Sequence, residues 1–206
     1  MVQVVAISGA SGSGKSTLAA AIVSKVGSDV AAVLPLDAYY HDLGHLRPAD
    51  REQVNFDHPD ALDLPLFRQH VMALKSGLAV RRPDYDFFSH CRRKESVRLA
   101  ARPLIVVEGI LVAADPGLRE FYDLLVFVEA ESKLRWERRL LRDQIARGRS
   151  AVSIARFWEQ AEVNFEAFGV AARHHADCIV RGEALVEDNV KTVLGCLRGP
   201  LPQGEG

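Results

Sequence analysis

The sequence is short of the features that mark several large classes of protein. Only three of its 206 residues are cysteine, at positions 91, 178 and 196. A low, odd number does not suggest a disulfide framework and fits a reducing compartment. No run of about 18 apolar residues occurs, so no membrane span is expected. The N-terminus also lacks the basic start and the small-residue cleavage site of a signal peptide. We therefore expect a cytoplasmic protein.

Neither sign of charge dominates the composition. Lysine and arginine number 26, aspartate and glutamate 27, and the formal net charge is -1. Dedicated nucleic-acid binders are usually basic overall, so a nucleic-acid partner is not expected. The apolar fraction of 48% and the length suit one globular domain. We predict a single domain over 1–198 and a disordered, proline- and glycine-rich tail over 199–206.

Short apolar runs alternate with longer helical patterns along the chain. This alternation predicts an α/β fold with a five-stranded, mainly parallel sheet flanked by helices. The segment 79–99 is polar, aromatic and basic, and we expect it to form a hairpin lobe beside the sheet. Strands are predicted at 2–7, 30–36, 104–107, 124–128 and 178–180, and helices at 15–26, 60–76, 131–147, 153–173 and 183–197.

The strongest local signal is a glycine-rich segment that directly follows the first predicted strand. Residues 9–16 match the P-loop pattern G-x-x-x-x-G-K-[ST] in full, and a helix is predicted to follow. Glycines let backbone N–H groups wrap closely around phosphate oxygens, and the start of a helix favours an anion. Lys15 supplies positive charge for the β- and γ-phosphates, and the Ser16 hydroxyl is a ligand for Mg²⁺. We therefore assign nucleoside triphosphate binding to Gly9, Ala10, Ser11, Gly12, Ser13, Gly14, Lys15, Ser16 and Thr17.

Two acidic residues follow predicted strands, and parallel strands bring such positions to one edge of a sheet. Glu108 follows the buried run 104–107 and is the second expected anchor for Mg²⁺, beside Ser16. Asp37 follows the strand 30–36, from where its carboxylate can take the proton of an attacking hydroxyl. Each has a plainer interpretation, an ordinary charged strand end for Glu108 and a turn or helix cap for Asp37.

An arginine-rich helix also fits a small-molecule kinase. Between residues 133 and 149 there are seven basic and two acidic residues, and positions 135, 138, 139 and 142 share one helical face. Such a face suits a lid, predicted over 131–150, that neutralises charge during phosphoryl transfer, with Arg142 and Lys15 as catalytic cations. The plainer alternative is a solvated basic face. A GTP-binding switch is not favoured because the sequence has no Asn-Lys-x-Asp segment.

Several segments together resemble the uridine kinase (uridine–cytidine kinase) family. The resemblance covers roughly residues 3 to 182 and includes the P-loop and the segment Asp37-Ala38-Tyr39-Tyr40. Its most discriminating part is Asn-Phe-Asp-His-Pro-Asp-Ala-Leu-Asp over 55–63. The predicted hairpin (83–92), Glu108-Gly109-Ile110 and the arginine-rich stretch 138–150 follow in family order.

The resemblance implies a P-loop kinase fold that phosphorylates uridine or cytidine to the 5′-monophosphate, with Asp37 as the base on the 5′-hydroxyl. It implies Mg²⁺, ATP or GTP as phosphoryl donor, and a homotetramer. Asp57, with Arg139 and Arg142, would hold the ribose hydroxyls or the phosphates. The implied nucleoside-binding set is Asp37, Tyr40, Phe56, Asp57, Tyr85, Phe87, His90, Arg139, Arg142 and Arg149, and Arg147 of the lid would join the donor set.

Alternatives stay open at this level. The aromatic side chains could be ordinary core or hairpin packing, and His90 a surface histidine. The stretches 155–158 and 162–164 depart from the family pattern and leave the preferred base undecided. The other functions in view are a related kinase for ribulose phosphate, pantothenate or nicotinamide riboside, and a regulatory module that binds nucleoside triphosphates.

Overall fold

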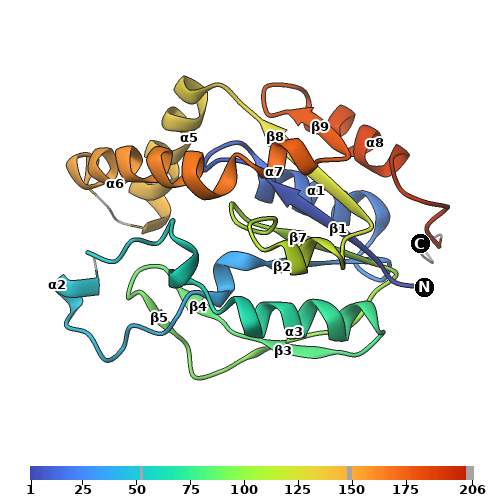
Figure 1. Ribbon diagram of the computed structural model, residues 1–206, viewed down its shortest axis with the longest axis horizontal. Coiled ribbons are helices and arrows are strands. Elements are labelled where there is room, and N and C mark those ends of the chain that lie inside the picture. Colours follow the sequence, from blue (N-terminus) through green and yellow to red (C-terminus); the bar gives the residue numbers. More distant parts are fainter. Residues whose placement is uncertain (52, 148–149, 203–206) are drawn as a thin grey trace.

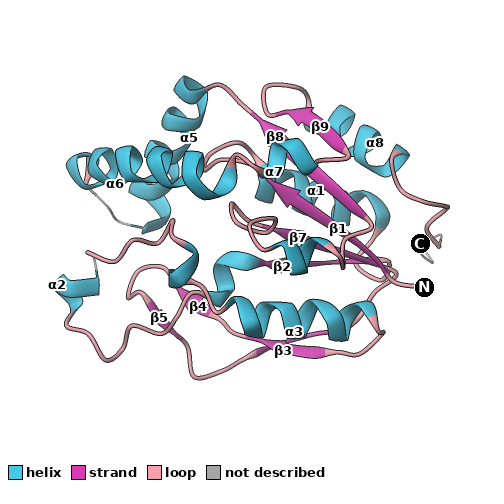
Figure 2. Ribbon diagram, in the orientation of Figure 1, coloured by secondary structure: helices cyan, strands magenta, loops and turns pink. Residues whose placement is uncertain are grey.

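The computed structural model describes residues 1–51, 53–147 and 150–202, with the backbone alone for residues 146 and 147. A five-stranded parallel sheet forms its centre, as predicted (Figures 1 and 2). The strands, in spatial order, are β2 (Ala31–Pro35), β7 (Leu104–Glu108), β1 (Gln3–Ser8), β8 (Leu124–Glu129) and β9 (Cys178–Arg181). The long helices are α1 (Lys15–Val26), α3 (Leu64–Lys75), α5 (Ser132–Arg147), α6 (Ala151–Asn164) and α8 (Val186–Gly195).

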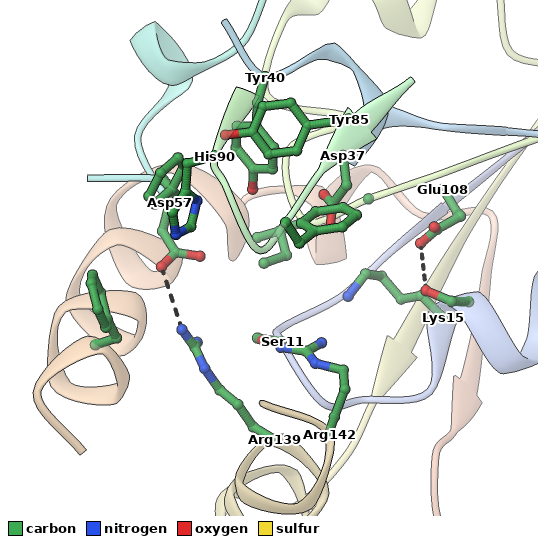
Figure 3. A pocket seen from close by; sticks show the side chains of 16 residues that line it. Ser11, Lys15, Asp37, Tyr40, Asp57, Tyr85, His90, Glu108, Arg139 and Arg142 are labelled. Carbon is green, nitrogen blue, oxygen red and sulfur yellow. Dashed lines mark hydrogen bonds and ion pairs between the residues drawn. The ribbon is translucent and has the colours of Figure 1, made fainter. Parts of the chain in front are cut away.

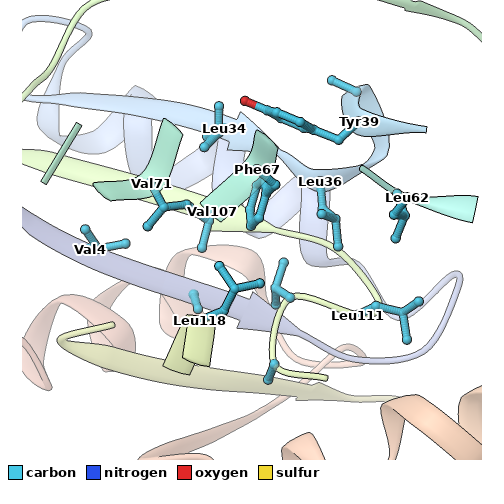
Figure 4. Close-up of a cluster of buried hydrophobic side chains, with 14 of the residues drawn as sticks. Val4, Leu34, Leu36, Tyr39, Leu62, Phe67, Val71, Val107, Leu111 and Leu118 are labelled. Carbon is cyan, nitrogen blue, oxygen red and sulfur yellow. The ribbon is translucent and has the colours of Figure 1, made fainter. Parts of the chain in front are cut away.

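Helices cover both faces of the sheet, because side chains along each strand alternate between the two faces. Val4 and Ala6 of β1 belong to a buried cluster with α3, whereas Val5 and Ile7 belong to a second cluster with α1 and α8. Figure 4 shows the first cluster, in which Phe67 and Val71 of α3 pack beside Val107 and Leu34 of the sheet. The central strands are buried on both sides, as near-continuous apolar runs predict.

Helix boundaries follow local signals that a hydrophobic pattern alone does not reveal. The predicted helix at 60–76 begins only at Leu64, because the Asp63 side chain caps it by accepting the N–H of Leu66 at 3.2 Å. The predicted helix at 153–173 divides into α6, a π-helical turn η3 (Phe165–Gly169) and α7 (Ala172–His175). A Cβ atom at Gly169 would lie 2.4 Å from the Phe165 ring, so glycine is required where this ring crosses the turn.

The segment 80–99 forms the expected antiparallel hairpin, but in two parts. Strand β3 (Val80–Arg82) pairs with β6 (Val97–Leu99), and β4 (Tyr85–Asp86) pairs with β5 (Cys91–Arg92). Pro83 lies between the two pairs and has no N–H to donate, which accounts for the interruption. The remaining short turns are η1 (Leu36–Tyr39), α2 (Pro48–Arg51), η2 (Pro59–Ala61) and α4 (Pro116–Arg119).

The C-terminal tail is only partly described. Leu201 packs at the edge of the second cluster, and residues 203–206 lie outside the described part of the chain. The division into a domain over 1–198 and a disordered tail therefore stays a prediction.

Candidate active site

The sheet register brings together three segments that the sequence singles out. Glu108 at the end of β7 lies opposite Ile7 of β1 on one side and Pro35 of β2 on the other. The P-loop follows β1, and Asp37 follows Pro35 in η1. The strand order β2-β7-β1 therefore places Asp37, Glu108 and the P-loop along one edge of the sheet, where open α/β sheets bind ligands.

The P-loop has the backbone that its composition predicts. Gly9, Gly12 and Gly14 have φ angles of 143°, 80° and 104°, which residues with a Cβ atom rarely adopt. A Cβ atom at Gly12 would also lie 2.4 Å from the carbonyl oxygen of Arg135 in α5. The loop enters α1 at Lys15, so it presents its N–H groups at the positive end of a helix dipole. This arrangement is a cradle for a phosphate chain.

Lys15 is buried between the P-loop and two carboxylates. Its Nζ donates a hydrogen bond to the carbonyl oxygen of Ala10 at 2.9 Å. Burial lowers the pKa of Lys15, and the negative charges of Glu108 and Asp37 oppose that shift. Its ammonium group is thus positioned where it would meet the negative charge of a phosphate chain.

Ser16 and Glu108 form a pair of oxygen donors beside the P-loop. The Ser16 hydroxyl donates to Oε2 of Glu108 at 3.1 Å (Figure 3). Burial, and then the charge of Asp37, raise the pKa of Glu108 to about 7, against the opposing effect of Lys15. The two carboxylates of Glu108 and Asp37 repel each other, and a cation bound beside them would offset that repulsion. Hydroxyl and carboxylate oxygens are ligands that Mg²⁺ prefers. The donor set therefore fits a magnesium ion.

A cavity opens beside this edge, which we call the aromatic cavity. Figure 3 shows Tyr40, Tyr85 and His90 gathered on one side of it, and Arg139 and Arg142 reaching toward it from α5. It also includes Lys15 and Glu108. The predicted nucleoside-binding residues with described side chains that line it are Asp37, Tyr40, Phe56, Asp57, Tyr85, Phe87, His90, Arg139 and Arg142.

The rings of the aromatic cavity are in contact with one another. Phe56 stacks on His90 with 4.6 Å between ring centroids and 20° between ring planes. Tyr40 meets Phe56 edge-on at 5.4 Å and contacts Tyr85 at 5.3 Å. His90 itself has a left-handed φ of 56° at the start of β5, which turns its ring into the site. Such a wall suits a flat, partly polar ring.

Charged side chains also line the aromatic cavity. Nη2 of Arg139 lies 3.9 Å from Oδ2 of Asp57, which comes from the loop before η2. The fully buried Asp143 accepts a hydrogen bond from Nε of Arg142 at 2.8 Å and lies 3.7 Å from Nε of Arg139. Asp143 thus orients two guanidinium groups that face the cavity. A carboxylate beside these arginines can bind hydroxyl or phosphate oxygens.

A second cavity lies on the other side of the P-loop, and we call it the P-loop cavity. Its walls combine residues 12–18 with Val128, Arg138 and the loop that follows β9. Nη2 of Arg138 donates to the carbonyl oxygen of Gly182 at 2.9 Å, and Nη1 donates to that of Ser13 at 3.4 Å. Arg138 thereby joins the P-loop to the loop after β9.

The two cavities share Lys15, Ser16 and Arg142. A phosphate chain that lies along the P-loop from the second cavity would therefore end at the first. Asp37 lines only the aromatic cavity of the two, where that cavity meets Lys15. The geometry is that of a site in which two substrates meet end to end.

The arginines of α5, the helix predicted to act as a lid, do not all face this site. Arg135 forms a two-pronged ion pair with Glu162 of α6, at 2.7 Å for both oxygens, and stacks over Trp158. It therefore fastens α5 to α6, while Arg138, Arg139 and Arg142 face the cavities. Arg149 and the side chain of Arg147 lie outside the described residues. Their roles stay predictions, as do those of the other site residues.

Some residues of the site were not predicted from the sequence. Phe157 of α6 lines the aromatic cavity. The sequence does not single it out, because it is one of several apolar residues in an amphipathic helix. The loop after β9 and the first turn of α8 also line the P-loop cavity, with residues that carry no motif. They are Gly182 and Ala184 of the loop and Val186 and Asn189 of α8. Only the strand order, which puts β9 beside β8, could have indicated them.

Comparison of sequences gives a consistent picture. The model of the phosphoribulokinase/uridine kinase family matches residues 4–187. A uridine kinase of Shewanella piezotolerans is 41% identical over 182 residues, which cover 86% of each chain. A uridine kinase of Chloroflexus aurantiacus is 43% identical over 151 residues, or 73% of this chain and 72% of the relative. None of the described helices is long and apolar enough to cross a membrane.

Comparison of structures confirms the fold. Phosphoribulokinase from Rhodobacter spheroides matches with a TM-score of 0.65 at 14% identity, over 87% of this chain and 70% of that one. D-glycerate 3-kinase from Cryptococcus neoformans matches with a TM-score of 0.59 at 15% identity, over 88% and 87%. At such identities the likeness concerns the fold alone, which is that of a P-loop kinase.

Proposed function

Because the chain belongs to the phosphoribulokinase/uridine kinase family and is a P-loop kinase, we propose that it transfers the γ-phosphoryl group of a nucleoside triphosphate to the 5′-hydroxyl of uridine or cytidine. The observation that carries the proposal is the junction of the two cavities at Lys15, Ser16 and Arg142. One cavity suits a triphosphate and the other a flat ring with attached hydroxyl groups. Asp37 lies where they meet.

In this proposal the triphosphate lies along the P-loop, with its terminal phosphate at the junction. Backbone N–H groups and Lys15 stabilise the charge that spreads over the γ-phosphate oxygens during transfer, and Arg142 adds a second cation from the lid helix. Ser16 and Glu108 would hold Mg²⁺, which supplies further neutralisation when bound. ATP and GTP both fit this description.

Asp37 is the proposed general base. The 5′-oxygen of the acceptor attacks the γ-phosphorus, the bond to the β–γ bridging oxygen breaks, and the hydroxyl proton passes to the Asp37 carboxylate. Asp57 and Arg139 bind the ribose hydroxyls, and the rings of Phe56 and His90 receive the base. Holding the two substrates in line supplies much of the rate gain by removing translational and rotational freedom.

The aromatic wall argues against one rival acceptor, a sugar phosphate. An acceptor such as ribulose phosphate carries an additional phosphate group and would need cations where Tyr40, Phe56 and Tyr85 lie. A regulatory module would need no general base at the junction. A homotetramer in the cytoplasm remains what the resemblance implies, and sedimentation of the purified protein would establish the assembly.

An acceptor scan tests the proposal directly. Release of nucleoside diphosphate is measured with MgATP and with MgGTP while uridine, cytidine, adenosine, ribulose 5-phosphate, pantothenate and nicotinamide riboside are added in turn. Turnover with uridine or cytidine alone is the expected result. Turnover only with another acceptor would overturn the assignment of the aromatic cavity to a pyrimidine nucleoside. Release of nucleoside diphosphate that does not depend on any acceptor would overturn the proposal that the protein is a phosphotransferase.

A further inference from the structure

Asn164 is a buried amide at the end of α6, where the helix passes into the π-helical turn. Its Nδ2 donates to Oδ1 of Asn55 at 3.0 Å, and its Oδ1 accepts from Nδ2 of Asn55 at 3.3 Å. The two amides thus form a reciprocal pair between segments that are 109 residues apart in the chain. In Figure 1 the chain between α2 and α3 passes beside α6.

Other bonds select the same orientation of both amides. Nδ2 of Asn164 also donates to the carbonyl oxygen of Gln160 at 2.9 Å, which requires an N–H group at that place. Oδ1 of Asn55 also accepts the backbone N–H of Asp57 at 3.2 Å, which requires an oxygen there. Turning either amide over would break bonds on both sides of it. The pair therefore has one satisfied arrangement, and leaving its buried groups unpaired would be costly.

The amide pair ends at the loop that supplies two walls of the aromatic cavity. Phe56 and Asp57 follow Asn55 directly, in a stretch that belongs to no helix or strand. Phe56 stacks on His90, and Asp57 faces Arg139. Because no sheet or helix ladder fixes this stretch, its position depends on side-chain bonds such as those of Asn55.

We propose that Asn164 is a positioning residue, which acts through Asn55 to fix the place of residues 56–57 in the aromatic cavity. The inference rests on the proposed function, because it gives a residue of α6 the task of holding the loop that binds the acceptor. Asn164 lines neither the aromatic cavity nor the P-loop cavity. Replacing Asn164 should therefore weaken binding of the acceptor and leave binding of the donor unchanged.

The first test compares KM values for acceptor and donor. In Asn164→Ala the acceptor KM should rise about tenfold, because a loop misplaced by about 1 Å loses much of its effect on orientation. The donor KM should stay within about twofold of wild type, since no contact of Asn164 reaches the P-loop. Val163→Ala is the matched control, because this neighbouring side chain is 70% exposed. An equal rise of both KM values, or the same rise in the control, would overturn the proposal.

A double-mutant cycle with Asn55→Ala tests whether the two amides act as one unit. If they do, the double variant should raise the acceptor KM no more than Asn55→Ala alone, because Asn164 acts through Asn55 and Asn55 also accepts the N–H of Asp57. If the effects of the two substitutions on the acceptor KM were additive, the two amides would not act as one unit. Asn164→Asp adds a second variant of native size, in which an oxygen replaces the donor that faces Asn55 and the Gln160 carbonyl, and it should raise the acceptor KM at least as much as alanine.

Amide hydrogen exchange separates this inference from the proposed function, because it needs no acceptor. A peptide covering residues 53–58 should exchange faster in Asn164→Ala than in wild type, while a P-loop peptide and the Val163→Ala control stay unchanged. Unchanged exchange over 53–58 would overturn the positioning role, whatever the acceptor scan shows. Faster exchange in a protein that phosphorylates neither nucleoside would uphold the role and reject the substrate.

Discussion

Asp37 and Glu108 are acids at the ends of two neighbouring strands, Asp37 in the turn η1 after β2 and Glu108 as the last residue of β7, but their surroundings give them different tasks. Glu108 accepts a hydrogen bond from Ser16 and lies at the P-loop, where a metal is expected. Asp37 opens toward the aromatic cavity and is the acid nearest to an incoming acceptor in our proposal. We predict that Asp37→Asn lowers kcat on the order of a hundredfold or more, because the isosteric amide cannot take a proton.

The donor should still bind to this variant. Titration with MgATP, followed by intrinsic fluorescence or calorimetry, should give an affinity close to that of wild type. Glu159→Gln, the same change of carboxylate to amide at an exposed position on α6, serves as a control for general effects of substitution. Wild-type turnover by Asp37→Asn would remove this residue from the mechanism.

Residue roles could be predicted where a motif constrains the backbone or the charge. The P-loop residues, Asp37 and Glu108 are such positions, since each occupies a strand end that topology brings to one edge. Phe157 and Asn164 carry no such signal, because a helix pattern does not tell which buried residue faces a cavity. Arg135 was predicted within a phosphate-facing set, but its pairing with Glu162 depends on a helix packed against α5.

The P-loop and α5 meet at Gly12, where no side chain has room. Alanine there would combine a φ of 80° with a Cβ atom 2.4 Å from the Arg135 carbonyl oxygen. Strain of this kind costs about 1–3 kcal/mol, and relieving it must move the loop or α5. We predict that Gly12→Ala loses about tenfold or more in MgATP affinity.

Gly195→Ala is the matched control for that variant. A Cβ atom at Gly195 would meet nothing within 4 Å. Gly195 is the last residue of α8 and does not have a left-handed φ. The melting temperature and donor affinity of Gly195→Ala should stay near those of wild type. Retained MgATP affinity in Gly12→Ala would contradict the close fit of loop and helix.

Helix α3 carries a pH-dependent contact with the turn that bears Asp37. The hydroxyl of Tyr39 and Nδ1 of His70 lie 2.7 Å apart, and burial lowers the pKa of His70 below its usual value of 6.5, against the opposing charge of Asp63. The folded state therefore binds this proton less readily than the unfolded chain. The contribution to stability is complete above pH 6.5 and is lost as pH falls toward the lowered pKa.

Urea unfolding at several values between pH 5 and pH 8 would measure this contribution. His70→Gln should flatten the fall in unfolding free energy on the acid side, and His174→Gln, an exposed control, should leave it as in wild type. The same acid dependence in wild type and His70→Gln would show that other groups cause it.

The order and type of the main elements could be predicted, because buried parallel strands and amphipathic helices have different periods. What these periods could not predict depends on single residues at particular points of the chain. The π-helical turn follows from the Phe165 ring crossing Gly169, and the break in the hairpin follows from Pro83. The start of α3 is the exception, since the capping Asp63 and the following proline were visible in the sequence.

The whole molecule can be described as one sheet edge that serves two cavities. The P-loop follows β1, β7 ends in the carboxylate that we propose for Mg²⁺, and β2 leads into the turn with Asp37. The hairpin and the loop before η2 bring the aromatic side chains, and α5 reaches both cavities through Arg142. The central claim is that a nucleoside 5′-oxygen in one cavity attacks the terminal phosphate in the other.

Phosphorus NMR of the reaction mixture tests this claim most directly. With MgATP and uridine or cytidine, wild type should produce one phosphomonoester resonance, split by the two protons of the 5′-carbon, in equal amount to ADP. Asp37→Asn should produce it at least about a hundredfold more slowly. Inorganic phosphate in place of the ester, or an ester at the 2′- or 3′-oxygen, would contradict the account.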